Sequence, residues 1–185
     1  MAAISRSENG KAIPGAVTAE GFPPLAKADA NFLVLGSLPG VRSIAEKKYY
    51  AHPRNAFWPI MKALFAIDGD YESRRRQLIA NRIAVWDVLN SAVRPGSLDA
   101  DIRLDVARAN DFAAFFSSHS AISVVIFNGK KAESLFKRFV EARPNDPAAR
   151  FIALPSTSPA YAAMPYSGKL ARWREAFGLN DYTET

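Results

Sequence analysis

The chain contains no cysteine and only two histidines, His52 and His119, among its 185 residues. The absence of cysteine excludes disulfide bonds, thiol catalysis, zinc fingers and cysteine-held iron–sulfur clusters. Two imidazoles are also too few for an ordinary structural or hydrolytic zinc site. We therefore expect neither a metal nor another cofactor.

Long hydrophobic runs are absent as well. The N-terminal residues contain no hydrophobic core of a secretory signal, and no stretch is long enough to cross a bilayer. We expect a protein that does not associate with membranes, that works in the cytoplasm and that is a monomer.

The charge is only mildly one-sided, with 24 lysines and arginines against 18 acidic residues and a formal net charge of +6. Such an excess is a weak indication of an anionic partner, of which a nucleic-acid phosphate backbone is the leading candidate. The apolar share of 49% and the length of the chain fit one globular domain with a full core.

Residues 1–20 are small, polar and without periodicity, so we predict a mobile N-terminal tail. The segment GFPPL, which begins at Gly21, then opens the folded part. No internal repeat and no linker divides the remaining residues, and we expect a single domain over residues 21–185.

Strand-like and helix-like patterns alternate along the chain. Four short apolar runs are continuous rather than alternating, which is typical of parallel strands buried on both faces. They are NFLVLG from Asn31, RIAVWDVL from Arg82, ISVVIFNG from Ile122 and RFIAL from Arg150. Helical spacing occurs over residues 57–65, 112–116, 132–140 and 170–177. The pattern predicts a three-layer α/β/α sandwich around a short, mainly parallel four-stranded sheet.

Each predicted strand runs directly into an unusual polar segment. The four segments are GSLPG, DVLNSAVRPGSLD, NGKK and PSTSPA. In open parallel sheets, ligands bind at the carboxyl ends of the strands. We therefore expect the four segments to meet in one functional site.

The first segment, Gly36–Gly40, is a tight turn whose backbone N–H groups could meet an oxygen or a phosphate. It is not a phosphate loop of the Walker type, because it lacks the GK[ST] ending. From these five residues alone, a plain strand-to-helix turn is the favoured interpretation.

The stretch YYAHPRNAFW, from Tyr49 to Trp58, carries more rings and hydrogen-bonding groups than a simple connection needs. Phe57 lies in register with the core stripe of its helix, which favours packing as its role. Pro59 fits no later than the third helical residue, so the helix cap falls at Ala56 or beyond. This placement leaves Asn55 able to point elsewhere.

Asp87 interrupts an otherwise apolar strand. A carboxylate buried there without a partner would cost several kcal/mol. A structural ion pair, for which Arg94 is the obvious candidate, and a role in the site both remain open.

Two further segments offer groups that suit a phosphate. Lys130 and Lys131 open a helix, where cations oppose the helix dipole, so a bound phosphate could favour them, although a solvated charged face is the more common explanation. The hydroxyls of the PSTSPA loop can bind a phosphate or a base edge, or can simply close a turn. Tyr161, just after that loop, is placed where an apolar wedge could reach a duplex.

Taken in order, seven segments resemble the uracil-DNA glycosylase superfamily, and within it the hypoxanthine-DNA (deoxyinosine) glycosylase branch. They are GFPP, GSLPG, YYAHPRNAFW, WDVL, RPGSLD, FNGKKA and PSTSPA, and the resemblance covers residues 21–177. It implies a DNA repair enzyme that starts base excision repair on a deaminated base, most simply hypoxanthine, in double- or single-stranded DNA.

The chain departs from other branches of that superfamily at two positions. Leu38 stands where uracil-specific members carry Asp and mismatch-specific members carry Asn to handle the attacking water. Ser156 stands where those enzymes often have His or Asn. The resemblance to the hypoxanthine branch instead implies that Asn55, in HPRN, is the catalytic residue.

The resemblance also implies roles for the other segments. Asn55 would hydrogen-bond the water or the purine, and Phe57 would stack on the extruded base. The base pocket would be completed by Gly36, Ser37, Leu38, Asp87 and Asn128. The DNA would be contacted by Lys130, Ser156, Thr157, Ser158 and Tyr161.

The implied reaction is a monofunctional hydrolysis of the N-glycosidic bond through an oxocarbenium-like sugar. Two alternatives stay open: a glycosylase directed at uracil or xanthine, and a catalytically silent DNA-binding module on the same fold. A serine hydrolase is disfavoured because the chain contains no GxSxG nucleophile elbow.

Overall fold

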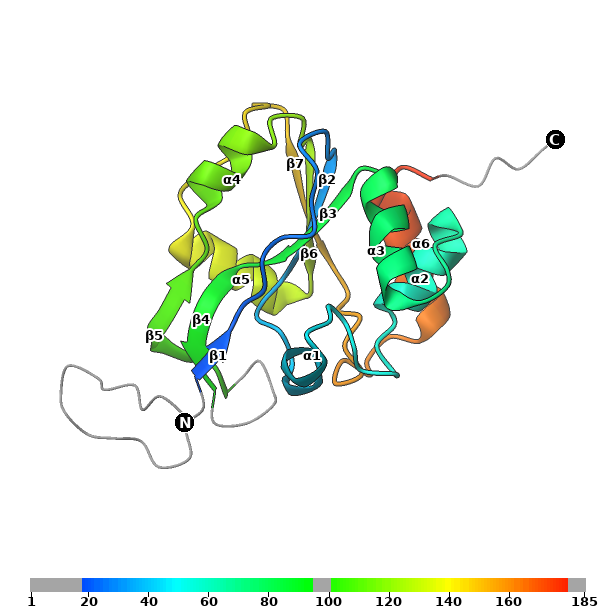
Figure 1. The fold of residues 1–185 in the computed structure, drawn as a ribbon, viewed down its shortest axis with the longest axis horizontal. Coiled ribbons are helices and arrows are strands. Elements are labelled where there is room, and N and C mark those ends of the chain that lie inside the picture. Colours follow the sequence, from blue (N-terminus) through cyan, green and yellow to red (C-terminus); the bar gives the residue numbers. More distant parts are fainter. Residues whose placement is uncertain (1–17, 95–100, 180–185) are drawn as a thin grey trace.

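The computed structural model describes residues 18–94 and 101–179 (Figure 1). Its strands are β1 (Thr18–Glu20), β2 (Phe32–Gly36), β3 (Ile83–Asp87), β4 (Leu89–Val93), β5 (Arg103–Ala109), β6 (Val124–Asn128) and β7 (Arg150–Leu154). Its helices are α1 (Val41–Glu46), α2 (Phe57–Phe65), α3 (Tyr71–Ala80), α4 (Phe112–Ser118), α5 (Lys130–Phe139) and α6 (Tyr166–Ala176).

The centre of the molecule is a parallel sheet with the strand order β3-β2-β6-β7. Helices α4 and α5 cover one of its faces, and α2, α3 and α6 cover the other (Figure 1). The predicted three-layer α/β/α sandwich with a four-stranded parallel sheet is therefore confirmed.

Alternating side chains of the central strands build two separate cores. Leu33 and Leu35 of β2 pack in the cluster that includes the α4 phenylalanines, whereas Val34 packs with Trp173 of α6 in the other. All three β2 side chains are fully buried. A strand that is apolar on both faces has this environment, which explains why β2 reads as a continuous hydrophobic run.

A second sheet, with the antiparallel order β1-β4-β5, was not expected from the sequence. The run at 82–89, predicted as one strand, is divided: β3 ends at Asp87 and β4 begins at Leu89 in the other sheet. The β5 strand alternates charged and apolar residues and is nowhere fully buried, so it lacks the signal of a core strand.

The folded part also begins earlier than predicted. Thr18 lies opposite Val93, and Glu20 lies opposite Ser91, so β1 is an ordered edge of the second sheet rather than the end of a tail. The boundary at residue 20 was wrong because so short a strand carries little pattern of its own. The remainder of the expected tail, residues 1–17, lies outside the described residues.

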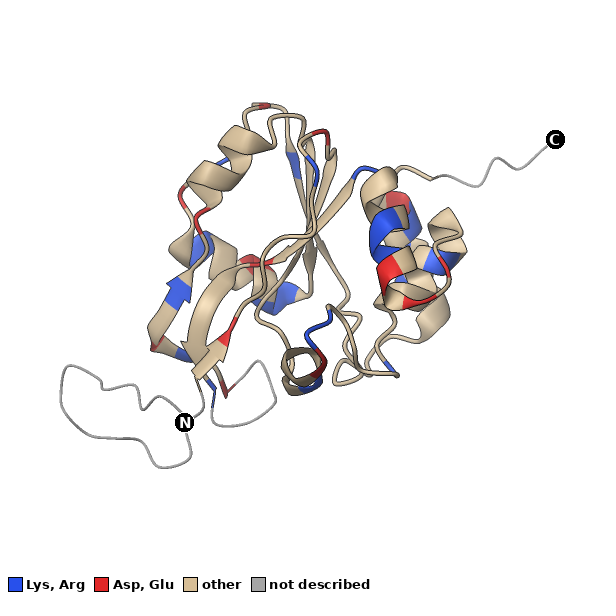
Figure 2. Cartoon of the chain, in the orientation of Figure 1, with Lys and Arg blue, Asp and Glu red and all other residues tan. Residues whose placement is uncertain are grey.

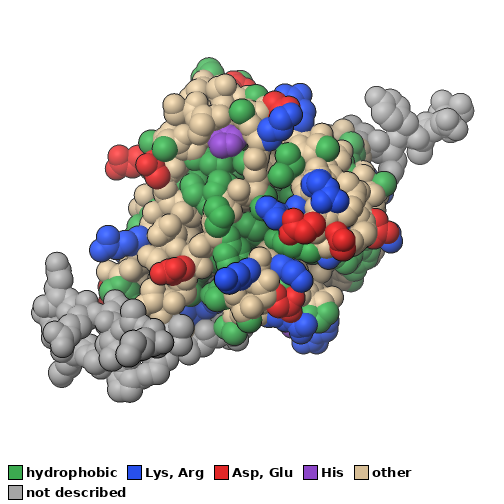
Figure 3. Space-filling model, in the orientation of Figure 1, with side chains coloured by type: hydrophobic (Ala, Val, Ile, Leu, Met, Phe, Trp, Pro, Cys, Tyr) green, Lys and Arg blue, Asp and Glu red, His purple; other side chains and the backbone are tan. Residues whose placement is uncertain are grey.

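Charged side chains of both signs are distributed over the helices and loops (Figures 2 and 3). Within the part of the chain that the structure describes, no helix is long and apolar enough to cross a membrane. The same residues contain no group of three or more side chains that could hold a metal ion.

Candidate active site

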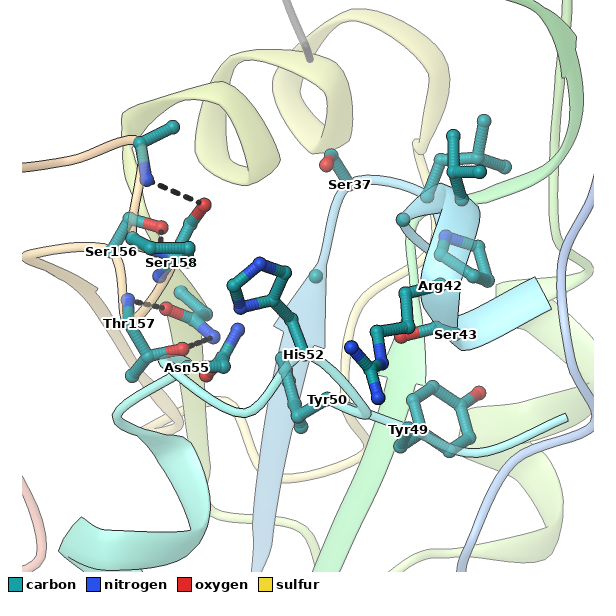
Figure 4. Close-up of a pocket in the computed structure, with 18 of the residues that line it drawn as sticks. Ser37, Arg42, Ser43, Tyr49, Tyr50, His52, Asn55, Ser156, Thr157 and Ser158 are labelled. Carbon is teal, nitrogen blue, oxygen red and sulfur yellow. Dashed lines mark hydrogen bonds between the residues drawn. The ribbon is translucent and has the colours of Figure 1, made fainter. Parts of the chain in front are cut away.

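A cavity of about 750 Å³ opens at the carboxyl ends of the parallel strands. This volume falls within the usual range for small-molecule sites, about 300–1,000 Å³. The strand ends contribute Gly36, Asp87 and Asn128 to its lining, and the loop after β7 contributes residues 156–161. The structure thus brings the four polar segments together in one place, shown in Figure 4.

Tyr50 supplies the aromatic wall of the cavity. Its ring stacks on Phe57, with centroids 4.1 Å apart and an interplanar angle of 28°. Tyr50 has the left-handed backbone conformation, φ 54°, which is uncommon for a bulky residue. This conformation places the Tyr50 ring over the first turn of α2.

Phe57 itself does not line the cavity. It is fully buried and also contacts Trp173 of α6, at 6.0 Å between ring centroids. Its expected role as the ring in contact with the base is therefore corrected: Phe57 faces the core, as its position on α2 requires, and Tyr50 covers it on the cavity side.

The backbone before Tyr50 is held by α2 and α3. The Tyr49 N–H donates to the Tyr71 hydroxyl at 2.8 Å, and the Tyr49 carbonyl accepts from the Trp58 indole at 3.1 Å. Both anchoring rings belong to described helices that pack against the sheet. The position of the Tyr50 ring is consequently set by the fold rather than by a loose loop.

Asn55 precedes the helix cap at Ala56, as predicted, but its side chain is not fully independent of the helix. Its Oδ1 accepts a hydrogen bond from the Phe57 N–H at 2.9 Å. This bond orients the amide and leaves Nδ2, which has no hydrogen-bond partner among the described residues, as a donor at the cavity wall. The prediction that Asn55 is able to point elsewhere thus holds for Nδ2, while Oδ1 is bound to the start of the helix.

Asp87 lies at the floor of the cavity, where β3 ends, and is 4% exposed. A Cβ added at Gly36 would collide with Asp87 Oδ1, so glycine at this position is what permits the carboxylate to approach β2. Burial, with a smaller contribution from the Asp87 charge, raises the pKa of Tyr50 above its ordinary value. Tyr50 is therefore a neutral phenol at physiological pH.

The Tyr50 hydroxyl is buried beside the Asn128 side chain and makes no hydrogen bond of acceptable geometry with a described residue. The Asn128 amide is committed to the loop after β7: its Oδ1 accepts from the Thr157 N–H and its Nδ2 donates to Thr157 Oγ1, both at 2.8 Å. Asn128 thus positions the loop as well as lining the cavity.

The serine loop, residues 156–158, has two kinds of hydroxyl. Thr157 is 1% exposed and is held by Asn128, whereas the Ser156 and Ser158 oxygens accept backbone N–H groups of residues 158 and 160 at 3.2 and 3.3 Å. Since a hydroxyl that accepts can still donate, Ser156 and Ser158 keep O–H donors for an anion. Tyr161 is exposed at the rim of the cavity.

The remaining predicted residues divide into two groups. Ser37 and Leu38 are buried and line the cavity, where Leu38 presents a hydrocarbon surface that cannot hold a water by hydrogen bonding. Lys130 is exposed in the first turn of α5 and does not belong to the described cavity lining. Its contact with DNA remains a prediction.

Four basic side chains at the cavity were not selected from the sequence as site residues: Arg42, His52, Arg54 and Arg94. His52 Nδ1 accepts from the Arg54 N–H at 3.1 Å, so the neutral ring carries its proton on Nε2. In Figure 4 the His52 ring lies between the serine loop and Arg42. Since α1 itself was not predicted, no pattern in the sequence could have placed Arg42 here.

Comparisons with known proteins agree with this geometry. A sequence model of the Uracil DNA glycosylase superfamily matches residues 23–177. A hypoxanthine DNA glycosylase of Methanosarcina barkeri is 35% identical over 116 residues, which are 61% of this chain and 72% of that protein. A hypoxanthine DNA glycosylase of Methanosarcina acetivorans is also 35% identical, over 115 residues, covering 60% of this chain and 72% of the relative.

A solved structure shows the same fold. The solution NMR structure of a candidate uracil DNA glycosylase from Methanosarcina acetivorans superposes with a TM-score of 0.69 at 29% sequence identity. The match covers 87% of this chain and 99% of the other. Together with the superfamily match over residues 23–177, the fold and the relatives lead to one conclusion: this chain belongs to the uracil DNA glycosylase superfamily.

Proposed function

We propose that this chain is a monofunctional DNA glycosylase that hydrolyses the N-glycosidic bond of hypoxanthine, the base of deoxyinosine, in DNA. The observation that carries the proposal is the orientation of the Asn55 amide. Its Oδ1 is bound by the Phe57 N–H, so its Nδ2 is a donor at the cavity. Leu38, which also lines the cavity, cannot hold a water by hydrogen bonding. The two curated relatives, both hypoxanthine DNA glycosylases, support the choice of base.

The cavity requires that the target nucleotide leave the base stack. Extrusion costs a few kcal/mol and is cheapest for a damaged or mispaired base. Stacking of the extruded base on an aromatic ring returns about 1–3 kcal/mol. We assign that contact to Tyr50, whose ring lines the cavity and is supported from behind by Phe57.

Polar groups at the cavity suit a purine lactam. Hypoxanthine presents acceptors at O6 and N7, as guanine does, and a donor at N1. A carboxylate at the floor, Asp87, accepts from N1–H, while Asn55 Nδ2 offers a donor. Adenine carries a lone pair at N1 in place of the hydrogen, so it would face the Asp87 carboxylate unfavourably.

The chemistry follows from charge that develops on the leaving base. As the bond between C1′ and the base nitrogen breaks, the base becomes an anion, and donors at its rim strengthen their hydrogen bonds. Water adds its oxygen to the oxocarbenium-like C1′ and releases a proton, and the products are free base and an abasic site. No lysine is found among the described residues that line the cavity, which supports a reaction without a Schiff base or strand cleavage.

The active unit in this proposal is the monomer. The double- or single-stranded DNA partner enters at the rim formed by the serine loop and Tyr161. Ser156 and Ser158 retain donors there for phosphate oxygens.

The experiment that tests the function is single-turnover excision on four matched duplexes that carry inosine, uracil, xanthine or no lesion. Alkali then cuts the abasic sites. We expect excision of hypoxanthine in clear preference to uracil. Preferential uracil or xanthine excision would overturn the choice of base and leave the glycosylase in place.

A second candidate is a catalytically silent DNA-binding module. It is favoured by Leu38 and Ser156, which stand where other branches of the superfamily carry water-handling side chains. Binding of all four duplexes without excision of any base would establish this candidate and overturn the enzyme.

A further inference from the structure

A second, smaller hollow adjoins the active-site cavity and is not used by the mechanism above. Its volume is about 320 Å³. Arg54, Asn55 and Thr157 line both spaces, so the two are separated only by the wall that these residues form. That wall is fixed by the hydrogen bond from the Ala56 N–H to the Thr157 carbonyl, at 2.9 Å.

Lys169 of α6 forms the far side of the hollow and is only 6% exposed. Its Nζ donates to the Tyr161 carbonyl at 2.8 Å and lies 5.2 Å from the centre of the Tyr161 ring. In the described part of the chain it has no ion pair with a carboxylate. Burial lowers the pKa of this ammonium, as expected where a cation is desolvated without a counter-ion.

Arg54 provides a second cation on the near side of the hollow. Its backbone is fixed by the bond to His52 Nδ1, and its guanidinium forms no ion pair with residues 18–94 or 101–179. The Tyr166 hydroxyl, which donates to the Pro59 carbonyl at 3.2 Å, closes the hollow at one edge. None of the described residues that line the space is acidic.

Two cations without acidic partners around a small hollow describe a site for an anion. A phosphate would supply the negative charge that the buried Lys169 ammonium lacks. Its oxygens would also accept hydrogen bonds from the planar donor fork of the Arg54 guanidinium. The volume admits a phosphate with part of its sugar and several waters.

We propose that this hollow binds one backbone phosphate of the DNA strand that carries the lesion, through Arg54 and Lys169. In this proposal the strand passes over the wall at Asn55, beside the serine loop, to deliver its nucleotide to the cavity. A phosphate flanks that nucleotide on each side along the strand, so one of the two falls beside the wall. The inference rests on the proposed function in requiring DNA as the ligand, and not on the identity of the excised base.

The test is a methylphosphonate scan, in which one phosphate at a time is made neutral on either side of a tetrahydrofuran abasic-site analogue. Binding of each duplex is measured by fluorescence anisotropy for the full chain and for Arg54→Gln and Lys169→Met. The control is Arg76→Gln, which removes the same charge from an exposed position on α3 that lines neither space.

We expect the unmodified protein to lose about tenfold in affinity at one phosphate position. Both site variants should be insensitive to neutralisation at that position, and the slope of log K against log salt should fall by about 0.9 for each. The Arg76→Gln control should keep the full profile of the unmodified protein. Since Arg54 is exposed, its variant keeps the test valid even if Lys169→Met lowers the melting temperature.

Three results would overturn the inference. The site variants could retain the same position-specific sensitivity as the unmodified protein, or Lys169→Met could weaken all duplexes equally while Arg54→Gln has no effect. In the third result, inorganic phosphate or a mononucleotide raises the melting temperature of the unmodified protein but not of Arg54→Gln, and no position of the methylphosphonate scan changes DNA affinity. The hollow would then bind a free phosphate compound. Failure of the proposed function is seen separately, as absence of base excision with an unchanged scan.

Discussion

The Tyr50 ring lies over the Phe57 ring at a centroid distance of 4.1 Å, and only Tyr50 of this pair lines the active-site cavity. The pair therefore joins the core to the site. Phe57 is fully buried, so its ring is a rigid support for one face of the Tyr50 ring. The other face of Tyr50 is turned toward the cavity.

Substitution of Tyr50 should affect excision more than stability. Tyr50→Ala removes the stacking surface, and we expect single-turnover efficiency on inosine DNA to fall roughly 5- to 150-fold, the equivalent of 1–3 kcal/mol. Tyr50→Phe keeps the ring and should retain most of the stacking contribution. Equal losses in the two variants would show that the hydroxyl, rather than the ring face, is what matters.

The matched change in the supporting ring has the opposite profile. Phe57→Ala empties a fully buried position and should reduce the free energy of unfolding by about 3–5 kcal/mol in a urea titration. Excision should be measured well below the melting temperature of Phe57→Ala, so that the variant and the unmodified protein are both folded when their activities are compared. A stable Phe57→Ala protein with lost activity would return the stacking role to Phe57.

Asn55 can be tested with a variant that separates its two atoms. Asn55→Asp keeps an oxygen that accepts from the Phe57 N–H and removes the Nδ2 donor. We expect excision of hypoxanthine to fall about 100- to 1,000-fold, as for loss of a donor to a developing anion. The melting temperature should stay close to that of the unmodified protein.

Asn55→Ala provides the comparison, because it removes both atoms. It should lose the same activity and, in addition, about 0.5–2 kcal/mol of stability with the loss of the bond to the helix start. Retention of full activity by either variant would contradict the assignment of Asn55.

The approach of Asp87 to Gly36 predicts an energetic coupling between the two positions. Gly36→Ala places a methyl group against Asp87 Oδ1 and should destabilise the protein by about 1–3 kcal/mol. In an Asp87→Ala background the same change should cost less, with a coupling energy of about 0.5–3 kcal/mol in a double-mutant cycle. Strict additivity of the two changes in urea unfolding would show that the close approach has no energetic consequence.

Much of this fold could be predicted from the sequence because the central strands β2, β3 and β6 are apolar up to their last residue. The run at 31–36 is apolar on both faces, and its environment in the structure is the one that such a run predicts. The β5 strand, with Arg103 and Asp105 alternating with apolar neighbours, lies at the edge of a half-exposed sheet and gave no such signal. Local pattern thus predicted the buried strand β2 and gave no signal for β5, whereas β7, predicted as buried on both faces, is a largely exposed edge strand.

The site was predictable in its location and less so in its detail. Helical register correctly places Phe57 in the core, but it cannot show that a preceding residue at φ 54° turns its ring over the same side chain. Lys169 was also beyond sequence reasoning, because nothing distinguishes it among 24 basic residues until α6 packs and buries it. Both features depend on contacts between segments far apart in the chain.

The buried hydroxyl of Tyr50 also predicts how stability changes in alkali. Burial, and then the Asp87 charge, raises the pKa of Tyr50, so the folded protein keeps this proton at pH values where the unfolded chain releases it. The folded state therefore binds more protons than the unfolded state above the ordinary tyrosine pKa of about 10. The stabilising contribution is complete below that pH and is lost as the pH rises above it.

The measurement is the free energy of unfolding in urea between about pH 9 and pH 11, compared between the unmodified protein and Tyr50→Phe. Above about pH 10 the unmodified protein should lose up to about 1.4 kcal/mol per pH unit more than the variant. Tyr166→Phe, which removes the hydroxyl of an exposed tyrosine, is the control. Parallel curves for all three proteins would mean that the Tyr50 hydroxyl reaches solvent, and its burial beside Asp87 would then be contradicted.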